Sequence, residues 1–187
     1  MNAPLKNLPT IEFQLNHQSV HAYEGESILK AAQRHGVDIP HLCHKDGLRA
    51  DGNCRACVVE IKGERTLAPS CCRTATAGLE VLVSERAVKS QKMVLEMLLS
   101  DMPDAGYKWN DASSTDVASA PASNAALTQH GELSDWASRM GVNVRPELRA
   151  LRREQPACDA SHPAMAVNLD ACIQCNRCVR ACREEQV

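Results

Sequence analysis

The sequence is poor in aromatic residues, with two tryptophans, two tyrosines and one phenylalanine among 187 residues. Stacking surfaces for bases are built from aromatic side chains, so this scarcity argues against nucleic-acid binding. An excess of one charge is also lacking, because 21 Lys and Arg residues stand against 23 Asp and Glu residues. The formal net charge of −2 therefore predicts no long-range field that would select a polyanionic partner.

Long apolar runs are missing as well. No stretch approaches the roughly 20 consecutive apolar residues of a membrane-spanning helix, so we expect no membrane span. The segment from Met1 to Asn16 lacks the continuous apolar core of a secretory signal, which favours a cytoplasmic location. The remaining composition, 44% hydrophobic and 24% charged, is typical of a soluble folded protein.

Cysteine is abundant but unevenly placed. None of the ten cysteines occurs before residue 43 or between residues 72 and 158. They form two tight groups: Cys43, Cys54, Cys57, Cys71 and Cys72, then Cys158, Cys172, Cys175, Cys178 and Cys182. A disulfide framework would spread its bridges over a small secreted domain, whereas clusters at C-x-x-C spacing without a signal peptide indicate metal sites.

The N-terminal half alternates between strand and helix patterns. Apolar residues at every second position predict strands over 10–16, 20–23, 57–62 and 79–83. Ser27 is a suitable N-cap for a helix that Gly36 ends. One helix crossing a mixed sheet predicts a small α+β domain.

The C-terminal half has a different organisation. Residues 84–100 have the pattern of an amphipathic helix, and residues 103–128 consist mostly of small and polar residues that cannot form a core. Short helices are expected around 133–140 and after Pro146. The resulting division is a folded domain over 1–84 with the first cysteine group, an amphipathic helix over 85–102, a flexible linker over 103–128, short helices over 129–160, and a segment over 161–187 with most of the second cysteine group.

The first cysteine group has the donor set of a two-iron cluster. Ten residues separate Cys43 from Cys54, two separate Cys54 from Cys57, and thirteen separate Cys57 from Cys71. Four thiolates complete a 2Fe–2S cluster, and a C-x-x-C loop lets two of them face inward together. Gly47 would let the loop backbone turn its N–H groups toward the cluster sulfurs.

Several alternatives remain at this first group. Adjacent side chains diverge on extended backbone, so only one of Cys71 and Cys72 is expected to bind iron. We favour Cys71 and expect Cys72 to be a buried small apolar residue. His41 and His44 flank Cys43 and are expected at the surface or behind the ligands, although a mixed His/Cys cluster is conceivable. The same thiolates would also bind zinc in a zinc-stabilised interaction module, but zinc sites usually have two compact C-x-x-C pairs.

The second group, Cys172, Cys175, Cys178 and Cys182, has the spacing of a bacterial four-iron motif. In two-cluster ferredoxins the first three cysteines hold one 4Fe–4S cluster and the fourth binds the neighbouring one. The ligand set within the chain is then incomplete, so we expect either part of a longer polypeptide or a naturally short protein. Alternatively all four bind one cluster, which a helix holding Cys178 and Cys182 at positions i and i+4 would permit.

Other features of the C-terminal third have simpler explanations. Cys158 lies outside the motif and is expected to be an incidental thiol. The region is locally basic, which predicts a solvated helix face or a surface that docks on an acidic partner. The basic residues concerned are Arg145, Arg149, Arg152, Arg153, Arg177, Arg180 and Arg183.

The stretches 39–43, 52–61 and 68–71 resemble the two-iron domain at the start of the large iron–sulfur subunit of respiratory complex I. NAD-reducing hydrogenases and NAD-dependent formate dehydrogenases share this domain. The stretch 161–187 looks most like the alpha subunit of cytoplasmic, molybdenum- or tungsten-containing formate dehydrogenase.

This resemblance implies a β-grasp ferredoxin fold and an electron relay between a molybdopterin site and a flavin subunit that reduces NAD. Molybdopterin, FMN and NAD would belong to the parent complex, and flavin/NAD-binding iron–sulfur subunits would be the partners. An NAD-reducing hydrogenase is the alternative parent. The family's molybdopterin domain lies outside these residues, so no catalytic residue is assigned.

The sequence also departs from the family. Between the two cysteine motifs, the family usually carries a further four-iron cluster, which is held by one histidine and three cysteines. Here Met102 stands in place of the histidine and Leu133 in place of the last cysteine. We therefore predict that this cluster is absent.

Overall fold

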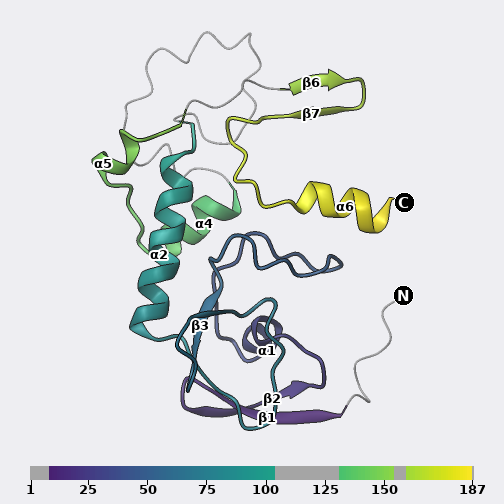
Figure 1. The fold of residues 1–187 in the computed structure, drawn as a ribbon, viewed down its shortest axis with the longest axis vertical. Coiled ribbons are helices and arrows are strands. Elements are labelled where there is room, and N and C mark those ends of the chain that lie inside the picture. Colours follow the sequence, from purple (N-terminus) through teal and green to yellow (C-terminus); the bar gives the residue numbers. More distant parts are fainter. Residues whose placement is uncertain (1–8, 104–130, 154–158, 187) are drawn as a thin grey trace. The chain divides into compact units, whose positions relative to one another are not determined.

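A computed structural model describes residues 9–103, 131–153 and 159–186 (Figure 1). Nearly all of the expected linker over 103–128 and the incidental thiol Cys158 lie outside the described residues. The chain divides into two compact units. Unit 1 comprises residues 1–91 and 176–187, and unit 2 comprises residues 92–175.

Unit 1 is built on a five-stranded mixed sheet with the order β2-β1-β5-β3-β4. β1 (Thr10–Leu15) and β2 (Gln18–Tyr23) form an antiparallel hairpin. β1 also pairs in parallel with β5 (Glu80–Leu82), which in turn lies antiparallel to β3 (Val58–Ile61). The edge strand β4 (Ala68–Pro69) pairs with β3. The pairing of β1 with β5 brings together the two ends of the segment that carries the first cysteine group.

The helix α1 (Ile28–Arg34) contributes to the core of this sheet. It begins as expected, since the Ser27 hydroxyl accepts a hydrogen bond from the Lys30 amide, and Gly36 follows its end at a φ of 74°. The side chains of Ile28 and Leu29 are fully buried in one cluster with those of Phe13 and Leu15. Burial of apolar side chains from both layers fixes the loop between α1 and β3, where the cysteines lie.

The helix α2 (Glu85–Ser100) follows the sheet directly. Its first half is held to β3 by Gln91, whose side chain is 1% exposed and donates a 2.8 Å hydrogen bond to the Val58 carbonyl. The Ser84 hydroxyl lies 3.3 Å from the Ala87 amide and accepts its hydrogen bond at the start of the helix.

Unit 2 contains the short helices α4 (Glu132–Arg139) and α5 (Pro146–Arg149) and a two-stranded hairpin. Pro146 stands in the first turn of α5 as expected, where its missing N–H costs no hydrogen bond. The hairpin of β6 (Asp159–His162) and β7 (Met165–Val167) pairs with an irregular register. None of the helices in the described ranges has the length and apolar content to span a bilayer.

The mixed sheet with its helices confirms the α+β class predicted from the sequence. The predicted strands and the helices after Ser27, after Ser84, near residue 133 and at Pro146 are all present. The β6–β7 hairpin and the two-residue β4 were not predicted. These strands are too short to produce a clear alternation.

Candidate metal centre

The first three cysteines lie on one irregular loop between α1 and β3. The amide of Cys43 donates to the Cys54 sulfur at 3.4 Å, and the amide of Cys54 donates to the Cys43 sulfur at 3.5 Å. This reciprocal pair closes the loop. Gly52 just before Cys54 and Arg55 just after it have φ values of 61° and 58°, so the backbone turns sharply on both sides of the ligand position.

Cys71 reaches the same place from the segment after β4. The amide and hydroxyl of Ser70 both donate to the Cys57 carbonyl, at 3.1 and 2.7 Å. The Ser70 carbonyl accepts from the Leu29 amide at 3.0 Å, in the first turn of α1. Ser70 therefore ties the Cys71 segment both to α1 and to the end of the C-x-x-C loop.

The four thiols form one continuous set of contacts. Side-chain hydrogen bonds link Cys43 to Cys54 and to Cys71, and Cys71 in turn to Cys57. Three of the sulfur-bearing residues are buried, with Cys43 and Cys57 at 0% and Cys71 at 3% exposure, while Cys54 is half-buried. The structure thus brings together all four cysteines that the spacing selected, from two distant segments of the chain.

These contacts shift the pKa values of the four thiols in opposite directions. Hydrogen bonds from the Cys54 and Cys71 thiols hold the pKa of Cys43 well below its usual value. The same bonds raise the pKa of Cys54 and of Cys71. The hydrogen bond with Cys71, opposed by burial, lowers the pKa of Cys57 to about 7. Two of the four sulfurs are therefore more easily ionised than a free thiol, which suits metal ligation.

The donor set fits a two-iron cluster. Four cysteine thiolates are the ligands that this group takes, and burial with N–H···S hydrogen bonds is how a protein holds and tunes it. Among the described residues, no three His, Cys, Asp or Glu side chains are arranged around a point as ligands of a single metal ion. The fit to a cluster rests on the linked set of four sulfurs.

Cys72 is exposed, so the expectation that it is a buried apolar residue is wrong. Its sulfur lies 3.6 Å from that of Cys71, at the outer side of the set. The turn that follows β4 gives the reason. The Cys72 amide donates to the Pro69 carbonyl at 3.1 Å, and this tight turn leaves the Cys72 side chain at the surface.

The two flanking histidines differ in burial. His44 is 7% exposed, its Nε2 lies 3.5 Å from an Asp46 carboxylate oxygen, and burial lowers its pKa. His41 is half-buried, and its Nδ1 lies 2.9 Å from the Ile39 carbonyl. His41 is thus engaged with its own backbone, and His44 packs behind the Cys43 loop.

The second cysteine group is described in two parts. Cys172 and Cys175 belong to unit 2, and Cys178 and Cys182 lie on α6 (Arg177–Glu185) in unit 1. Cys172 is exposed, and its sulfur accepts from the Gln174 amide at 3.4 Å. On α6, Cys178 and Cys182 are both exposed and stand four residues apart on one helix face.

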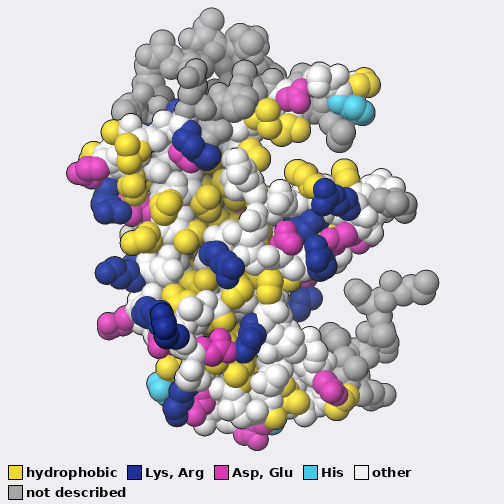
Figure 2. Space-filling model, viewed as in Figure 1, with side chains coloured by type: hydrophobic (Ala, Val, Ile, Leu, Met, Phe, Trp, Pro, Cys, Tyr) yellow, Lys and Arg dark blue, Asp and Glu magenta, His cyan; other side chains and the backbone are white. Residues whose placement is uncertain are grey.

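The arginines of the C-terminal third bind groups of the chain itself, which neither expectation for this basic region anticipated. In unit 1, Arg180 is 4% exposed and donates to the carbonyls of Cys43 and Arg49, and Arg177 donates to the His44 carbonyl at 2.7 Å. Figure 2 shows basic and acidic side chains next to each other on this face, with no broad field of one sign.

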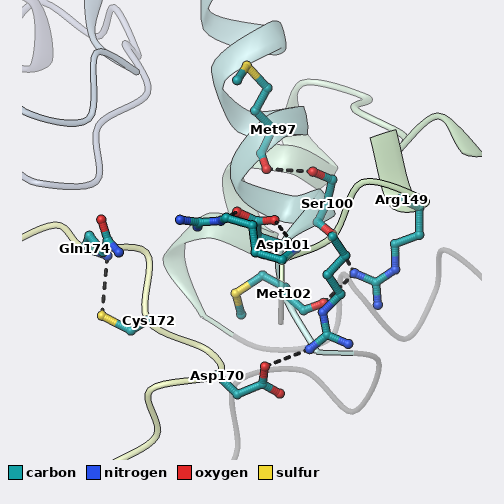
Figure 3. A network of polar contacts seen from close by, with 10 residues as sticks. Met97, Ser100, Asp101, Met102, Arg149, Asp170, Cys172 and Gln174 are labelled. Atoms are coloured by element: carbon teal, nitrogen blue, oxygen red, sulfur yellow. Dashed lines mark hydrogen bonds and ion pairs between the residues drawn. The ribbon is translucent and has the colours of Figure 1, made fainter. Parts of the chain in front are cut away.

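In unit 2, arginines bind the end of α2 (Figure 3). Arg149 donates to the carbonyls of Ser100 and Met102 at 2.7 and 2.6 Å. Arg153 pairs with the Asp101 carboxylate at 2.5 Å, and Arg152 with the Asp170 carboxylate at 2.8 Å.

This network lies at one of the positions where the resemblance placed ligands of a further cluster. Met102 and Leu133, which replace the expected histidine and cysteine, are 5% and 6% exposed. Both positions thus hold buried apolar side chains, and the absence of the further cluster stays a prediction.

Residues 9–86 match the family described as the 2Fe-2S iron-sulfur cluster binding domain. The matched range contains the whole mixed sheet and the four linked thiols. The mixed sheet and the linked thiols agree with this match.

Relatives extend the similarity beyond this domain. The mitochondrial NADH-ubiquinone oxidoreductase 78 kDa subunit of Candida albicans is 30% identical over 96% of this chain and 23% of its own length. NADP-reducing hydrogenase subunit HndD of Solidesulfovibrio fructosivorans is 32% identical over 87% of this chain and 26% of its own. The chain therefore spans about a quarter of the length of these curated relatives.

A solved structure is similar over most of the chain. A chain of the NAD+-reducing [NiFe]-hydrogenase in the H2-reduced state matches with a TM-score of 0.68 and 27% identity, over 94% of this chain and 67% of that one. The similarities confirm homology to complex I and hydrogenase subunits. They do not distinguish the formate dehydrogenase branch that the sequence favoured.

Proposed function

We propose that this chain is an electron-transfer module of an NAD-linked oxidoreductase, with Cys43, Cys54, Cys57 and Cys71 as the ligands of a 2Fe–2S cluster. The observation that carries the proposal is the continuous contact among these four sulfurs inside the segment that matches the 2Fe–2S family. A bound cluster supplies reversible one-electron chemistry. The chain's own residues hold the sulfurs, exclude water and donate N–H groups to them.

The environment of the set indicates where electrons would cross to a partner. Cys71 lines a surface pocket between the start of α1 and the loop after Cys43, together with Lys30 and Asp46. The other fully buried ligands, Cys43 and Cys57, are covered by protein. A partner subunit that approaches over this pocket would come close to the cluster on its Cys71 side.

For the second group we propose that Cys172, Cys175 and Cys178 supply most of a 4Fe–4S cluster. Cys182 would serve a neighbouring cluster whose other ligands come from elsewhere. The spacing supports this assignment. The parent enzyme that the motif over 161–187 favours is an NAD-dependent formate dehydrogenase, with molybdopterin and FMN held in other parts of the complex and flavin/NAD-binding subunits as partners.

An NAD-reducing hydrogenase is the second candidate parent, because a hydrogenase chain is similar over 94% of this chain. The formate dehydrogenase and the hydrogenase are distinguished by isolating the native complex through a tag on this polypeptide. NAD reduction is then measured with formate and with hydrogen. Formate-dependent reduction supports the first parent, and hydrogen-dependent reduction replaces it with the second. Reading the gene beyond the codon for Val187 shows which polypeptide carries the segment.

The cluster itself is tested on the purified chain. Anaerobic purification followed by iron, sulfide and zinc analysis is expected to give two irons and two sulfides bound by the first cysteine group, with an EPR signal on reduction. Zinc without iron or sulfide would refute the electron-transfer function and favour a zinc-stabilised interaction module.

A further inference from the structure

The helix α6 lies against the loop that carries Cys43, within unit 1 (Figure 1). The Arg180 guanidinium donates to the carbonyls of Cys43 and Arg49. One turn away, Arg177 donates to the His44 carbonyl at 2.7 Å. On the same face, the Glu184 carboxylate accepts from the Arg49 amide at 2.8 Å.

The spacing of these side chains shows a helix face fitted to the loop. Residues 177, 180 and 184 follow the i, i+3, i+7 pattern that places side chains on one side of a helix. They bind backbone groups, which are present whatever the side chains of the loop are. The contacts therefore hold the shape of the loop rather than one side-chain pair.

Arg180 differs from its neighbours because it is buried. Its side chain is 4% exposed, and its Nε lies 3.8 Å from a carboxylate oxygen of Asp51, which is 29% exposed. A buried guanidinium is costly unless its donors are bonded, and two of them are bonded to carbonyls of the loop. A positive charge is thereby kept at the backbone of the first ligand, where solvent screens it little.

We propose that Arg180 is a positioning residue for the two-iron centre, which fixes the backbone of Cys43 and raises the reduction potential through its buried charge. Reduction adds a negative charge to the centre, so a nearby buried cation stabilises the reduced form. The same helix carries Cys178 and Cys182. This inference rests on the proposed function.

The test is a redox titration followed by EPR on the full chain after anaerobic reconstitution. All variants carry Cys172→Ser and Cys175→Ser, so that the signal followed comes from the N-terminal cysteines. Arg180→Gln is expected to lower the equilibrium constant for reduction about tenfold, which equals a midpoint lower by about 59 mV. Arg183→Gln removes the same charge from an exposed position of α6 and is expected to leave the midpoint unchanged.

Two further variants separate charge from shape. Arg180→Lys keeps the charge and is expected to restore most of the midpoint, which a purely structural contact would not do. Asp51→Asn removes the neighbouring carboxylate and is expected to raise the midpoint, the opposite direction from Arg180→Gln. It decides the question even where Arg180→Gln takes up no iron.

The outcomes that overturn the inference are distinct from those that overturn the proposed function. Equal midpoints in the reference protein, Arg180→Gln and Asp51→Asn overturn the role of Arg180 alone. Equal losses in Arg180→Gln and Arg183→Gln do the same, because they point to overall charge. A reference protein that binds no iron at these cysteines overturns the proposed function, and the inference falls with it.

Discussion

The thiol loop of unit 1 and the arginine network of unit 2 are held together by different kinds of contact. Each holds a stretch of irregular backbone in place. In the first, Cys43, Cys54, Cys57 and Cys71 face one another and hold the pKa of Cys43 low. In the second, arginine side chains bond to the carboxylates and carbonyls around the end of α2.

The difference lies in what each region still needs. Hydrogen bonds between thiols are weak, so four clustered sulfurs gain most of their stability from an added metal group. The arginines of unit 2 already have oxygen partners from the chain. The further His/Cys-type cluster of the resemblance would require ligands where Met102 and Leu133 are buried. One region is thus suited to a cofactor, and the other is stabilised by its own side chains.

The comparison is tested most severely by Cys54→Ser. In a chain that also carries Cys172→Ser and Cys175→Ser, we expect nearly complete loss of iron and of the EPR signal, because a hydroxyl is a poor replacement for one of four thiolates. Cys72→Ser is the matched control, since this neighbouring thiol is exposed, and its iron content should stay at the reference level. An iron content of Cys54→Ser equal to that of the reference protein would refute the proposed set of four ligands.

A second substitution strains the loop without touching a ligand. Gly52 has a φ of 61°, and an added Cβ would lie 2.9 Å from the Cys72 sulfur. We expect Gly52→Ala to lower the free energy of unfolding of the metal-free protein by about 2 kcal/mol. Gly47→Ala is the control, because its φ of 87° carries strain but nothing lies within 4 Å of the added atom. Urea unfolding of both variants measures the contribution of the contact, and equal effects would show that only the backbone angle matters.

The arginine network is tested by Arg149→Ala. Loss of two charged hydrogen bonds to carbonyls is expected to cost about 2 kcal/mol of unfolding free energy. Arg153→Ala should cost at most about 1 kcal/mol, since that side chain is 58% exposed in its pair with Asp101. Neither substitution should change the iron content bound by the first cysteine group. A change in iron content would mean that the two regions are not independent.

The smallest effect concerns pH. Hydrogen bonds from Arg145 lower the pKa of Glu96 below its ordinary value of 4.5. The charged carboxylate therefore stabilises the fold above pH 4.5, and this contribution is lost as the pH falls through the lower pKa of the folded state. Glu96→Gln should be less stable than the reference protein at pH 7, with the difference in urea midpoint shrinking below pH 4.5. A difference that grows on acidification would reverse the sign of this coupling.

Much of unit 1 could be predicted from the sequence because its signals are local. Apolar residues at every second position predicted β1 and β5, and Ser27 and Gly36 predicted the start and the end of α1. The four-cysteine set also followed from spacing. The burial of Cys72 was predicted wrongly, because its exposure depends on a turn at Pro69 that no periodicity reveals.

The role of the arginines depends on contacts between residues far apart in the sequence. Arg180 binds a carbonyl 137 residues away, and a charged residue on a polar helix is ordinarily exposed. The spacing of Arg177, Arg180 and Glu184 on one face was the available signal. It shows a shared face without showing what covers it.

The parallel pairing of β1 with β5 has a consequence for the order of events during synthesis. Gln14 pairs with Glu80, so β1, which can pair with β2 at once, lacks its second partner until a strand 66 residues further along has been made. Contacts of such long sequence separation form slowly. Until β1 and β5 pair, the sheet that holds the cysteine loop is incomplete. The nascent thiols are therefore separate from one another and accessible to solvent until β5 has been made.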